Sequence, residues 1–570
     1  MTYRPPLEDS QFIAFEVLRA DRALAALPAF REVDRDLMTQ VLDEAGKFVA
    51  EVVAPLQAVG DRVGCRFEQG RVTTPPGFRD AYQAFWQAGW PALSSAPEDG
   101  GQGLPAMLEA VLYEMLSAAN HGWTMAPGLL HGAYECIKHH ASEDLKARYL
   151  QKVATGEWLA TMCLTEPHAG SDLGLTRTRA VPEADGSYRL SGTKIFISGG
   201  EHDLCDNIVH LVLARLPDAP PGPKGLSLFL VPKFMPDGSR SAVHCDRIEE
   251  KMGLHGSPTC VMRFDDATSW IVGQPGRGLA AMFVMMNAAR LHVALQGIGL
   301  LDAAWQKAHA YSLERRQMRA PGRGKSASEA DFIAEHPAIR RILDTQRAWI
   351  DGGRVLAYRT ALELDQARHL AGTDAEGAAR AQRWCSLITP VLKSAWTEQA
   401  FAGSSACLQV LGGHGYVSEW GLEQIVRDSR VAMIYEGTNE IQAIDLLVRK
   451  VLTDGGQGLS ALLADLVAQL PPDHAGRDRI RRLDAITATL AQAAPADPTL
   501  PFEVADDYLR AVALVLLDWA WARIAATPGA QSPRWRAPRQ ALARHVLPEF
   551  DMRLQIIATR CAESRESAVA

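Results

Sequence analysis

The sequence lacks the cysteine and histidine spacings that build metal sites or disulfide frameworks. Its nine cysteines are odd in number and contain no Cys-x-x-Cys pair, and its sixteen histidines contain no His-Glu-x-x-His motif. Scattered cysteines of this kind are typical of a reducing compartment. We therefore expect buried thiols, no metal ion and a cytoplasmic protein.

Long apolar runs without charge are also missing. The closest, around 511–526, is interrupted by Asp518 and Arg523, which favours a buried helix over a membrane span. The first residues contain no positive segment followed by an apolar one, so we expect no signal peptide. The net charge of -8 argues against a nucleic-acid partner held by bulk electrostatics.

What is present describes a large globular chain. It has 570 residues, 47% of them hydrophobic and 22% charged, which is enough for several domains with sizeable cores. Helical periodicity fills most of the chain, whereas short β-branched runs separated by Pro- and Gly-rich turns occupy the second quarter. We expect an N-terminal extension (1–35), an N-terminal helical domain (36–159), a central antiparallel β domain (160–275), a C-terminal helical domain (276–450) and an extra helical unit (455–570).

The most informative stretch is 431–446, in which an acid, Glu436, stands between apolar residues and a glycine. Gly437 breaks regular structure, and Thr438 can cap a helix whose inward face would carry Ile441, Ile444 and Leu447. A carboxylate at an apolar wall is partly desolvated, which raises its pKa from about 4.3 towards the roughly 6–7 that suits a general base. By spacing alone, an ordinary helix-start acid favoured by the helix dipole is the more common explanation.

Four further motifs occur in order along the chain. They are Gly-Glu-Trp-Leu-Ala-Thr-Met-Cys-Leu-Thr-Glu-Pro-His-Ala-Gly-Ser-Asp at 156–172, Lys-Ile-Phe-Ile-Ser-Gly-Gly at 194–200, Leu-Glu-Arg-Arg-Gln at 313–317 and Gln-Val-Leu-Gly-Gly-His-Gly-Tyr at 409–416. Together with Tyr-Glu-Gly-Thr at 435–438, they resemble the acyl-CoA dehydrogenase family of flavoproteins over about 35–450. The N-terminal segment and the helices after 455 are similar to a longer subgroup, which includes long-chain bacterial enzymes and dehydrogenases of 3-methylthiopropanoyl-CoA.

This resemblance implies an α+β fold in which a helical domain, an antiparallel β domain and a four-helix-type domain are followed by the extra helical unit. It also implies FAD-dependent α,β-dehydrogenation of an acyl-CoA to the trans-2-enoyl-CoA. Glu436 would take the α-proton while hydride passes to flavin N5. Its backbone N–H and a ribityl hydroxyl of FAD would hold the thioester carbonyl. The electrons would then pass to an electron-transfer flavoprotein.

The resemblance assigns binding roles to fourteen further residues. Arg315 would reach a neighbouring subunit's flavin pyrophosphate, and this role is favoured over a solvated helix face because the surrounding helix matches the family. Tyr435 and Phe196 would otherwise be core aromatics. The implied FAD contacts are Met162, Leu164, Thr165, Phe196, Ile197, Ser198, Arg315, Gln409, Gly413 and Thr438, and the implied acyl-CoA contacts are Ser171, Arg290, Tyr435 and Gly437.

Three positions depart from the family pattern. Glu440 stands where a glutamine commonly contacts FAD, and Asn287 replaces an aspartate often found near the CoA adenine. His336 is followed by Pro337, where many members have His-Gln. These changes put the corresponding contacts in doubt and leave the central chemistry untouched.

Several alternatives stay open at this point. An acyl-CoA oxidase would share the fold, and so would a flavin-free scaffold or a DNA-associated relative. The DNA-associated relative needs a basic C-terminal unit, whereas 455–570 has no lysine and matches its arginines about one for one with acids. Family members that lack this unit are often tetramers built from two dimers. The unit would cover the surface of the second dimer contact, so we expect a homodimer. The acyl group stays open between straight medium or long, 3-methylthiopropanoyl, branched and aromatic.

Overall fold

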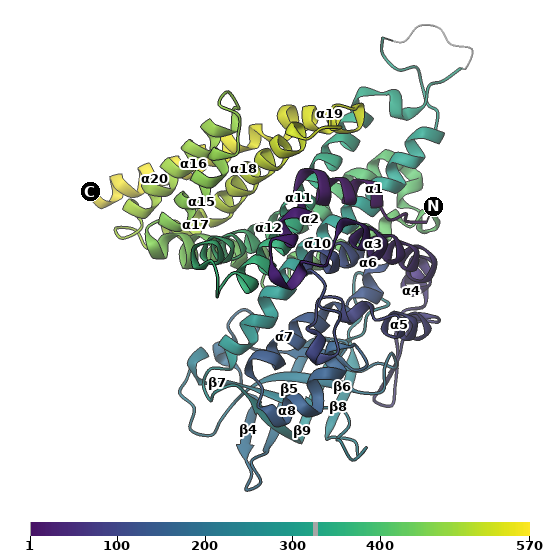
Figure 1. The fold of residues 1–570 in the computed structure, drawn as a ribbon, viewed down its shortest axis with the longest axis vertical. Helices are drawn as coiled ribbons and strands as arrows, with labels where there is room; N and C mark the ends of the chain where they lie inside the picture. Colours follow the sequence, from purple (N-terminus) through teal and green to yellow (C-terminus); the bar gives the residue numbers. More distant parts are fainter. Residues whose placement is uncertain (1, 323–328, 570) are drawn as a thin grey trace.

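The computed structural model describes residues 2–322 and 329–569. Figure 1 shows the strands gathered at the lower end of the molecule, long helices through its middle and the last helices of the chain at the upper left. The α+β class predicted from the sequence is confirmed. Eight cysteines are buried and Cys65 is half-buried, as the composition predicts.

The first 158 residues are mainly helical. Asp34 caps α3 by accepting a hydrogen bond from the Leu37 N–H at 2.8 Å. The helix α6 is buried along almost its whole length and forms the centre of this part. The elements are α1 (Leu7–Gln11), α2 (Ala20–Ala25), α3 (Arg35–Phe48), α4 (Gln57–Val63), β1 (Arg66–Glu68), β2 (Arg71–Thr73), α5 (Phe78–Gln87), α6 (Ala106–Thr124), α7 (Leu130–His140), α8 (Glu143–Leu145) and α9 (Gln151–Ala154).

A seven-stranded sheet follows, in the order β3-β6-β4-β5-β9-β7, with β8 paired to β9. An additional pairing of β6 with β7 closes the path on itself. The strands are β3 (Leu159–Cys163), β4 (Arg179–Pro182), β5 (Tyr188–Ser198), β6 (Ile208–Arg215), β7 (Leu226–Pro232), β8 (Val243–Ile248) and β9 (Thr259–Val272).

Most of these strands pair in the antiparallel sense expected from the sequence, but the sheet is mixed. β3 runs parallel to β6 from Leu159–Ile208 to Cys163–Val212, and β4 meets β6 in parallel at one residue pair. Between β3 and β6 the chain forms the antiparallel β4–β5 pair. This connection brings β6 beside β3 in the same direction.

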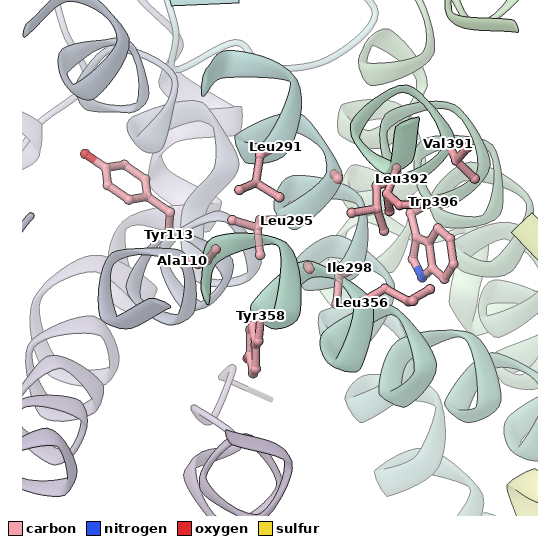
Figure 2. Packing of buried hydrophobic residues seen from close by; sticks show 14 of the residues in the cluster. Ala110, Tyr113, Leu291, Leu295, Ile298, Leu356, Tyr358, Val391, Leu392 and Trp396 are labelled. Carbon is pink, nitrogen blue, oxygen red and sulfur yellow. The ribbon is translucent and has the colours of Figure 1, made fainter. Parts of the chain in front are cut away.

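Three long helices form the core that joins the sheet to the remaining helices: α10 (Gly278–Glu314), α11 (Pro337–His369) and α12 (Ala375–Leu411). Figure 2 shows Leu291, Leu295 and Ile298 of α10 between Ala110 and Tyr113 of α6 on one side and Leu392 and Trp396 of α12 on the other. α10 is long and apolar enough to span a membrane by length and composition. Its packing between these helices explains the apolar composition instead.

Beyond the core, α13 (Leu422–Arg430) and α14 (Asn439–Ile444) precede the C-terminal unit, which packs on α11, α12 and α14. The Trp521 indole donates to the Ala348 carbonyl of α11 at 2.8 Å. Several arginines of this unit pair with acids, for example Arg482 with Asp551 at 2.6 Å. Its helices are α15 (Gln457–Ala468), α16 (Gly476–Ala493), α17 (Leu500–Glu503), α18 (Ala505–Ala526), α19 (Pro533–Ala541) and α20 (Pro548–Val569).

A buried ion network ties these parts together. The guanidinium of Arg354, on α11, lies 2.7 Å from Glu114 of α6 and 3.1 Å from Asp302 of α10, and all three side chains are fully buried. Tyr358 donates to the second Glu114 oxygen at 2.6 Å. Removing one member would leave the others charged and uncompensated in the interior.

We therefore expect Arg354→Met to lower the free energy of unfolding by about 3–5 kcal/mol, the usual cost of breaking a buried ion pair. The measurement is urea denaturation followed by circular dichroism. Arg380→Met is the control, because Arg380 pairs with Glu376 at an exposed site and should change stability by under about 1 kcal/mol. Equal losses in both variants would contradict this role of the network.

Candidate active site

The acid singled out by the sequence, Glu436, lies on a strained turn between α13 and α14. Glu436 has φ +58°, in the left-handed region that costs a non-glycine residue roughly 1–3 kcal/mol, and Gly437 follows at φ +87°. Thr438 caps α14 as predicted, since its side chain accepts from the Ile441 N–H at 3.4 Å. The turn is held in this form by contacts from neighbouring helices.

One of these contacts corrects the expected inward face of α14. Leu447 is fully buried as expected and the half-buried Ile444 packs against the core, but Ile441 is only half-buried, whereas Gln442 is fully buried. The Gln442 amide donates to the Glu436 carbonyl at 3.0 Å and to the Gly437 carbonyl at 3.3 Å. A polar side chain therefore faces inward here because the turn presents two carbonyls that need donors.

The Glu436 carboxyl has the electrostatics of a base. The residue is half-buried, but its Oε2 atom is fully buried and has no hydrogen-bond partner in the described part of the chain. Burial raises the pKa of Glu436 to about 7, against the opposing charges of Arg290 and Lys393. A carboxyl with this pKa is partly ionised near neutral pH and can accept a proton readily.

Tyr435 and Arg290 lie beside this acid. The Tyr435 hydroxyl donates to Gln296 Oε1 of α10 at 2.5 Å and lies 3.3 Å from His121 Nε2 of α6. Arg290, one and a half turns earlier on α10, donates to Asp445 at 3.3 Å. Its Nε atom is buried and has no hydrogen-bond partner among the described residues. Two of the residues predicted to contact the acyl-CoA thus adjoin Glu436, together with Gly437.

The predicted flavin loop meets β5 at a bulge. The pairing of β5 with β9 shifts between Lys194 and Ile197, which turns Phe196 to φ +60° and leaves it 59% exposed. The Ile195 N–H donates to the Thr165 carbonyl at 2.9 Å, so the loop and the bulge are adjacent. The half-buried residues Met162, Leu164, Thr165 and Ser198 belong to the same region.

Two further predicted contacts differ in exposure. Ile197 is 2% exposed and its side chain lies in the core of the sheet, so only its backbone can face a ligand. Ser171 is exposed on the loop that follows β3.

A buried ion pair that the sequence reasoning missed holds the loop. Lys194 donates to Glu166 Oε1 at 2.8 Å and to the Leu164 carbonyl at 2.9 Å. Glu166 also accepts from the Arg177 and Thr178 N–H groups. Burial alone would raise the pKa of Glu166, but Lys194 and these hydrogen bonds hold it below its usual value. The signal available in the sequence was a lysine in a run otherwise expected to form a β-strand.

The remaining predicted contacts form a second, distant group. Arg315 directly follows α10, and Gln409 and Gly413 are exposed near the end of α12. The Tyr311 hydroxyl, 2.9 Å from His414, joins these two ends. At 1.5 Å per residue, Arg315 lies about 37 Å along α10 from Arg290. These residues and the Glu436 turn cannot contact the same atoms of one ligand.

The three departures from the family pattern are also placed. Glu440 and Asn287 are exposed. A hydrogen bond to its own backbone and a second one to the Thr438 side chain lower the pKa of Glu440. His336 Nε2 lies 2.9 Å from the Gln317 carbonyl, near the second group. No cluster of three His, Cys, Asp or Glu side chains suited to a metal ion occurs within 2–322 and 329–569.

The residues around the bulge fit a flat tricyclic ring. Phe196 presents an exposed aromatic face, and the neighbouring Thr165 and Ser198 supply hydroxyls for hydrogen bonds at a ring edge. At the second group, a side-chain carbon added at Gly412 or Gly413 would meet no atom within 4 Å, so the backbone there is open to close approach.

Comparison with known proteins identifies the arrangement. Family models named acyl-CoA dehydrogenase match residues 36–157 (N-terminal domain), 161–267 (middle domain) and 276–451 (C-terminal domain). The chain belongs to the acyl-CoA dehydrogenase family. Acyl-CoA dehydrogenases are FAD-dependent, so this chain is an FAD-dependent oxidoreductase that acts on acyl-CoA.

Relatives in the acyl-CoA dehydrogenase family resemble most of the chain. A 3-methylmercaptopropionyl-CoA dehydrogenase of Ruegeria pomeroyi is 43% identical over 86% of this chain and 84% of its own length. The broad-specificity linear acyl-CoA dehydrogenase FadE5 of Mycobacterium tuberculosis is 36% identical over 85% and 81%. The recognition of the family and of its long subgroup is therefore confirmed.

Solved acyl-CoA dehydrogenase structures share the fold. ACDH-11 of Caenorhabditis elegans, in complex with C11-CoA, has a TM-score of 0.77 at 20% identity and covers 96% of this chain and 92% of its own. An enzyme of Bacillus anthracis complexed with FAD has a TM-score of 0.70 at 20% identity and covers 93% and 88%.

The Glu166–Lys194 pair yields a test of the flavin loop. We expect Lys194→Met to weaken FAD binding about 10- to 100-fold, because losing a buried charge-assisted contact costs about 1.5–3 kcal/mol and each 1.4 kcal/mol is tenfold. Fluorescence titration of the apoprotein with FAD measures the change. Lys224→Met, at an exposed position of the same domain, is the control. Unchanged affinity in Lys194→Met would show that the pair does not support the FAD site.

Proposed function

We propose that this dehydrogenase removes the α- and β-hydrogens of an acyl-CoA thioester with Glu436 as the base, giving the trans-2-enoyl-CoA. The observation that carries the proposal is the buried, unpartnered Oε2 atom of Glu436, with a pKa of about 7, on a turn whose conformation is fixed. No hydrogen bond within the described protein competes for this oxygen. It is therefore free to take a proton from a bound ligand.

The side chains around Glu436 would position the thioester. Tyr435 is fixed by Gln296, so its ring and the Gly437 backbone form one wall beside the base. The unpartnered Nε of Arg290 places a cation near the acid, and this favours the ionised carboxylate that accepts the α-proton. Ser171 and Arg290 complete the proposed acyl-CoA contacts.

When bound, FAD supplies the hydride acceptor at N5 for the β-hydrogen. In this proposal Phe196, Thr165, Ser198, Met162, Leu164 and the Ile197 backbone hold its ring, and Thr438 lies on the side of the base. An electron-transfer flavoprotein as electron acceptor and a cytoplasmic location remain part of the proposal.

We also propose the five-part division predicted from the sequence and a homodimer in which Arg315, Gln409 and Gly413 contact the cofactor of the other subunit. Leu313, Met318, Tyr416 and Val417 support it, because these large apolar side chains are 47–85% exposed at the same end of α10 and α12. The C-terminal unit covers a different face of α11 and α12, where it would block a second dimer contact.

The base assignment predicts that Glu436→Gln slows flavin reduction by about 10²- to 10⁴-fold, the usual contribution of a general base. Anaerobic titration with acyl-CoAs, followed by bleaching of the flavin band, measures this rate. The set begins with 3-methylmercaptopropionyl-CoA, named for the 43% identical relative, and continues with linear acyl-CoAs. Glu376→Gln, at an exposed acid of the same helical domain, is the control. Rapid bleaching by Glu436→Gln would exclude it as the base.

The dimer proposal predicts a mass of two chains, each of 62.1 kDa, in size-exclusion chromatography with light scattering. Tyr416→Asp should shift the population towards monomer, because it places a charge among the exposed apolar side chains. A stable tetramer would contradict the proposed role of the C-terminal unit, and a monomer with full activity would contradict the shared cofactor site.

A further inference from the structure

A lysine outside every motif of the sequence analysis contacts the base turn. Lys393, on α12, has no exposed surface, yet no carboxylate of the described chain lies within ion-pair distance of its ammonium. Its Nζ atom instead donates to the Gly437 carbonyl at 2.7 Å and to Asn439 Oδ1 at 3.0 Å. A buried cation without an ion pair is costly, so its retention calls for a specific use.

These contacts fasten the part of the strained turn that follows Glu436 to α12. Gly437 directly follows the base, and Asn439 is the first residue of α14. Asn439 is itself anchored, because its amide donates to the Ser394 carbonyl at 3.2 Å and its Oδ1 accepts from Thr397 at 3.3 Å. Gln442 holds the Glu436 carbonyl from the other side at 3.0 Å. The left-handed conformation at Glu436 therefore persists through donors on two helices.

The same ammonium acts on the charge of the base. The charged groups that face Lys393 are Glu436 and Glu440, which favour its protonated form, and Arg290, which opposes it. Burial is the largest influence and lowers the pKa of Lys393 to about 7. The base faces Arg290 from α10 and Lys393 from α12, both of which favour its ionised form. The charges of Lys393 and Glu436 therefore each favour the ionised form of the other.

We propose that Lys393 is a positioning residue for the dehydrogenation: it fixes the turn that aims the Glu436 carboxylate and supplies part of the positive charge that keeps this carboxylate ionised. The proposal rests on the proposed role of Glu436 as base. It assigns Lys393 no contact with substrate or cofactor and no proton transfer of its own.

The test compares Lys393→Met, Lys393→Gln and Lys393→Arg with the wild-type holoenzyme. Removing the charge raises the pKa of Glu436. When the pH is lowered, the base is therefore protonated, and activity is lost, at a higher pH than in the wild-type enzyme. We expect the acidic limb of kcat/KM to move up by about one unit in Lys393→Met and Lys393→Gln, since loss of a nearby opposite charge shifts a carboxyl by about 1–3 units. In Lys393→Met, kcat should also fall about 100-fold, as for a misplaced catalytic group. Lys393→Arg should keep the limb in place.

Lys251→Met is the matched control. Lys251 is also a lysine held among protein atoms whose ammonium donates to a backbone carbonyl, that of Ser257 at 2.9 Å, but it does not face Glu436. It should lose stability without moving the acidic limb. If Lys393→Met does not fold, Lys393→Gln carries the test, because its amide can still donate to the Gly437 carbonyl.

A second readout separates this proposal from the assignment of the reaction. Infrared difference spectra against Glu436→Gln report protonation of this carboxyl without substrate, and their pH midpoint should rise in Lys393→Met and Lys393→Gln. An unchanged midpoint and unchanged kcat would overturn the role of Lys393. If none of the acyl-CoAs bleaches the flavin band of the wild-type enzyme, the proposed reaction fails. The infrared midpoint still decides whether Lys393 sets the charge of Glu436.

Discussion

The buried ion network around Arg354 holds together the helices against which the Glu436 turn packs. The Arg354 guanidinium, on α11, joins Glu114 of α6 to Asp302 of α10. The network continues through Arg347 and Asp351 to Asp9 of the N-terminal segment and Arg534 of the C-terminal unit. Ion pairs need good geometry to repay the cost of burial, so they fix the relative register of these helices. Because α10 also carries Arg290 and Gln296, the register of α10 determines how both side chains approach the base turn.

Two positions of backbone strain coincide with the proposed chemistry. Two of the non-glycine residues with positive φ, Phe196 and Glu436, are those that would face the flavin ring and the substrate. Each is supported by a buried lysine: Lys194 holds the loop beside Phe196, and Lys393 holds the turn that carries Glu436. In both places the ammonium donates to a main-chain carbonyl that irregular backbone leaves without a regular partner. A neutral amide could make the same contact, but it would not add positive charge beside a carboxylate.

Sequence reasoning found the elements that depend on local pattern. The family, the helix and strand regions and the Thr438 cap all follow from short motifs and periodicity. It missed interactions that depend on tertiary contacts. Periodicity placed Leu447 on the buried face correctly, but it did not indicate that Gln442 is fully buried, because the turn needs a donor there. Nothing in the period-2 pattern of 194–198 indicated the bulge at Phe196, because a bulge is defined by the partner strand β9. The parallel β3–β6 pairing depends in the same way on strands far apart in the sequence.

The length of α10 connects the chemistry to assembly. Arg290 beside the base and Arg315 at the helix end are separated by about 37 Å at 1.5 Å per residue, so one straight helix serves two separate places. Under the proposed cross-subunit contact, each cofactor would need the end of α10 from another chain. The apolar side chains Leu313 and Tyr416 at that end stay exposed although the C-terminal unit is in place. The extension packs on α11, α12 and α14 instead. A helical addition on that face can therefore remove one type of subunit contact while it leaves intact the contact on which the proposed cofactor site depends.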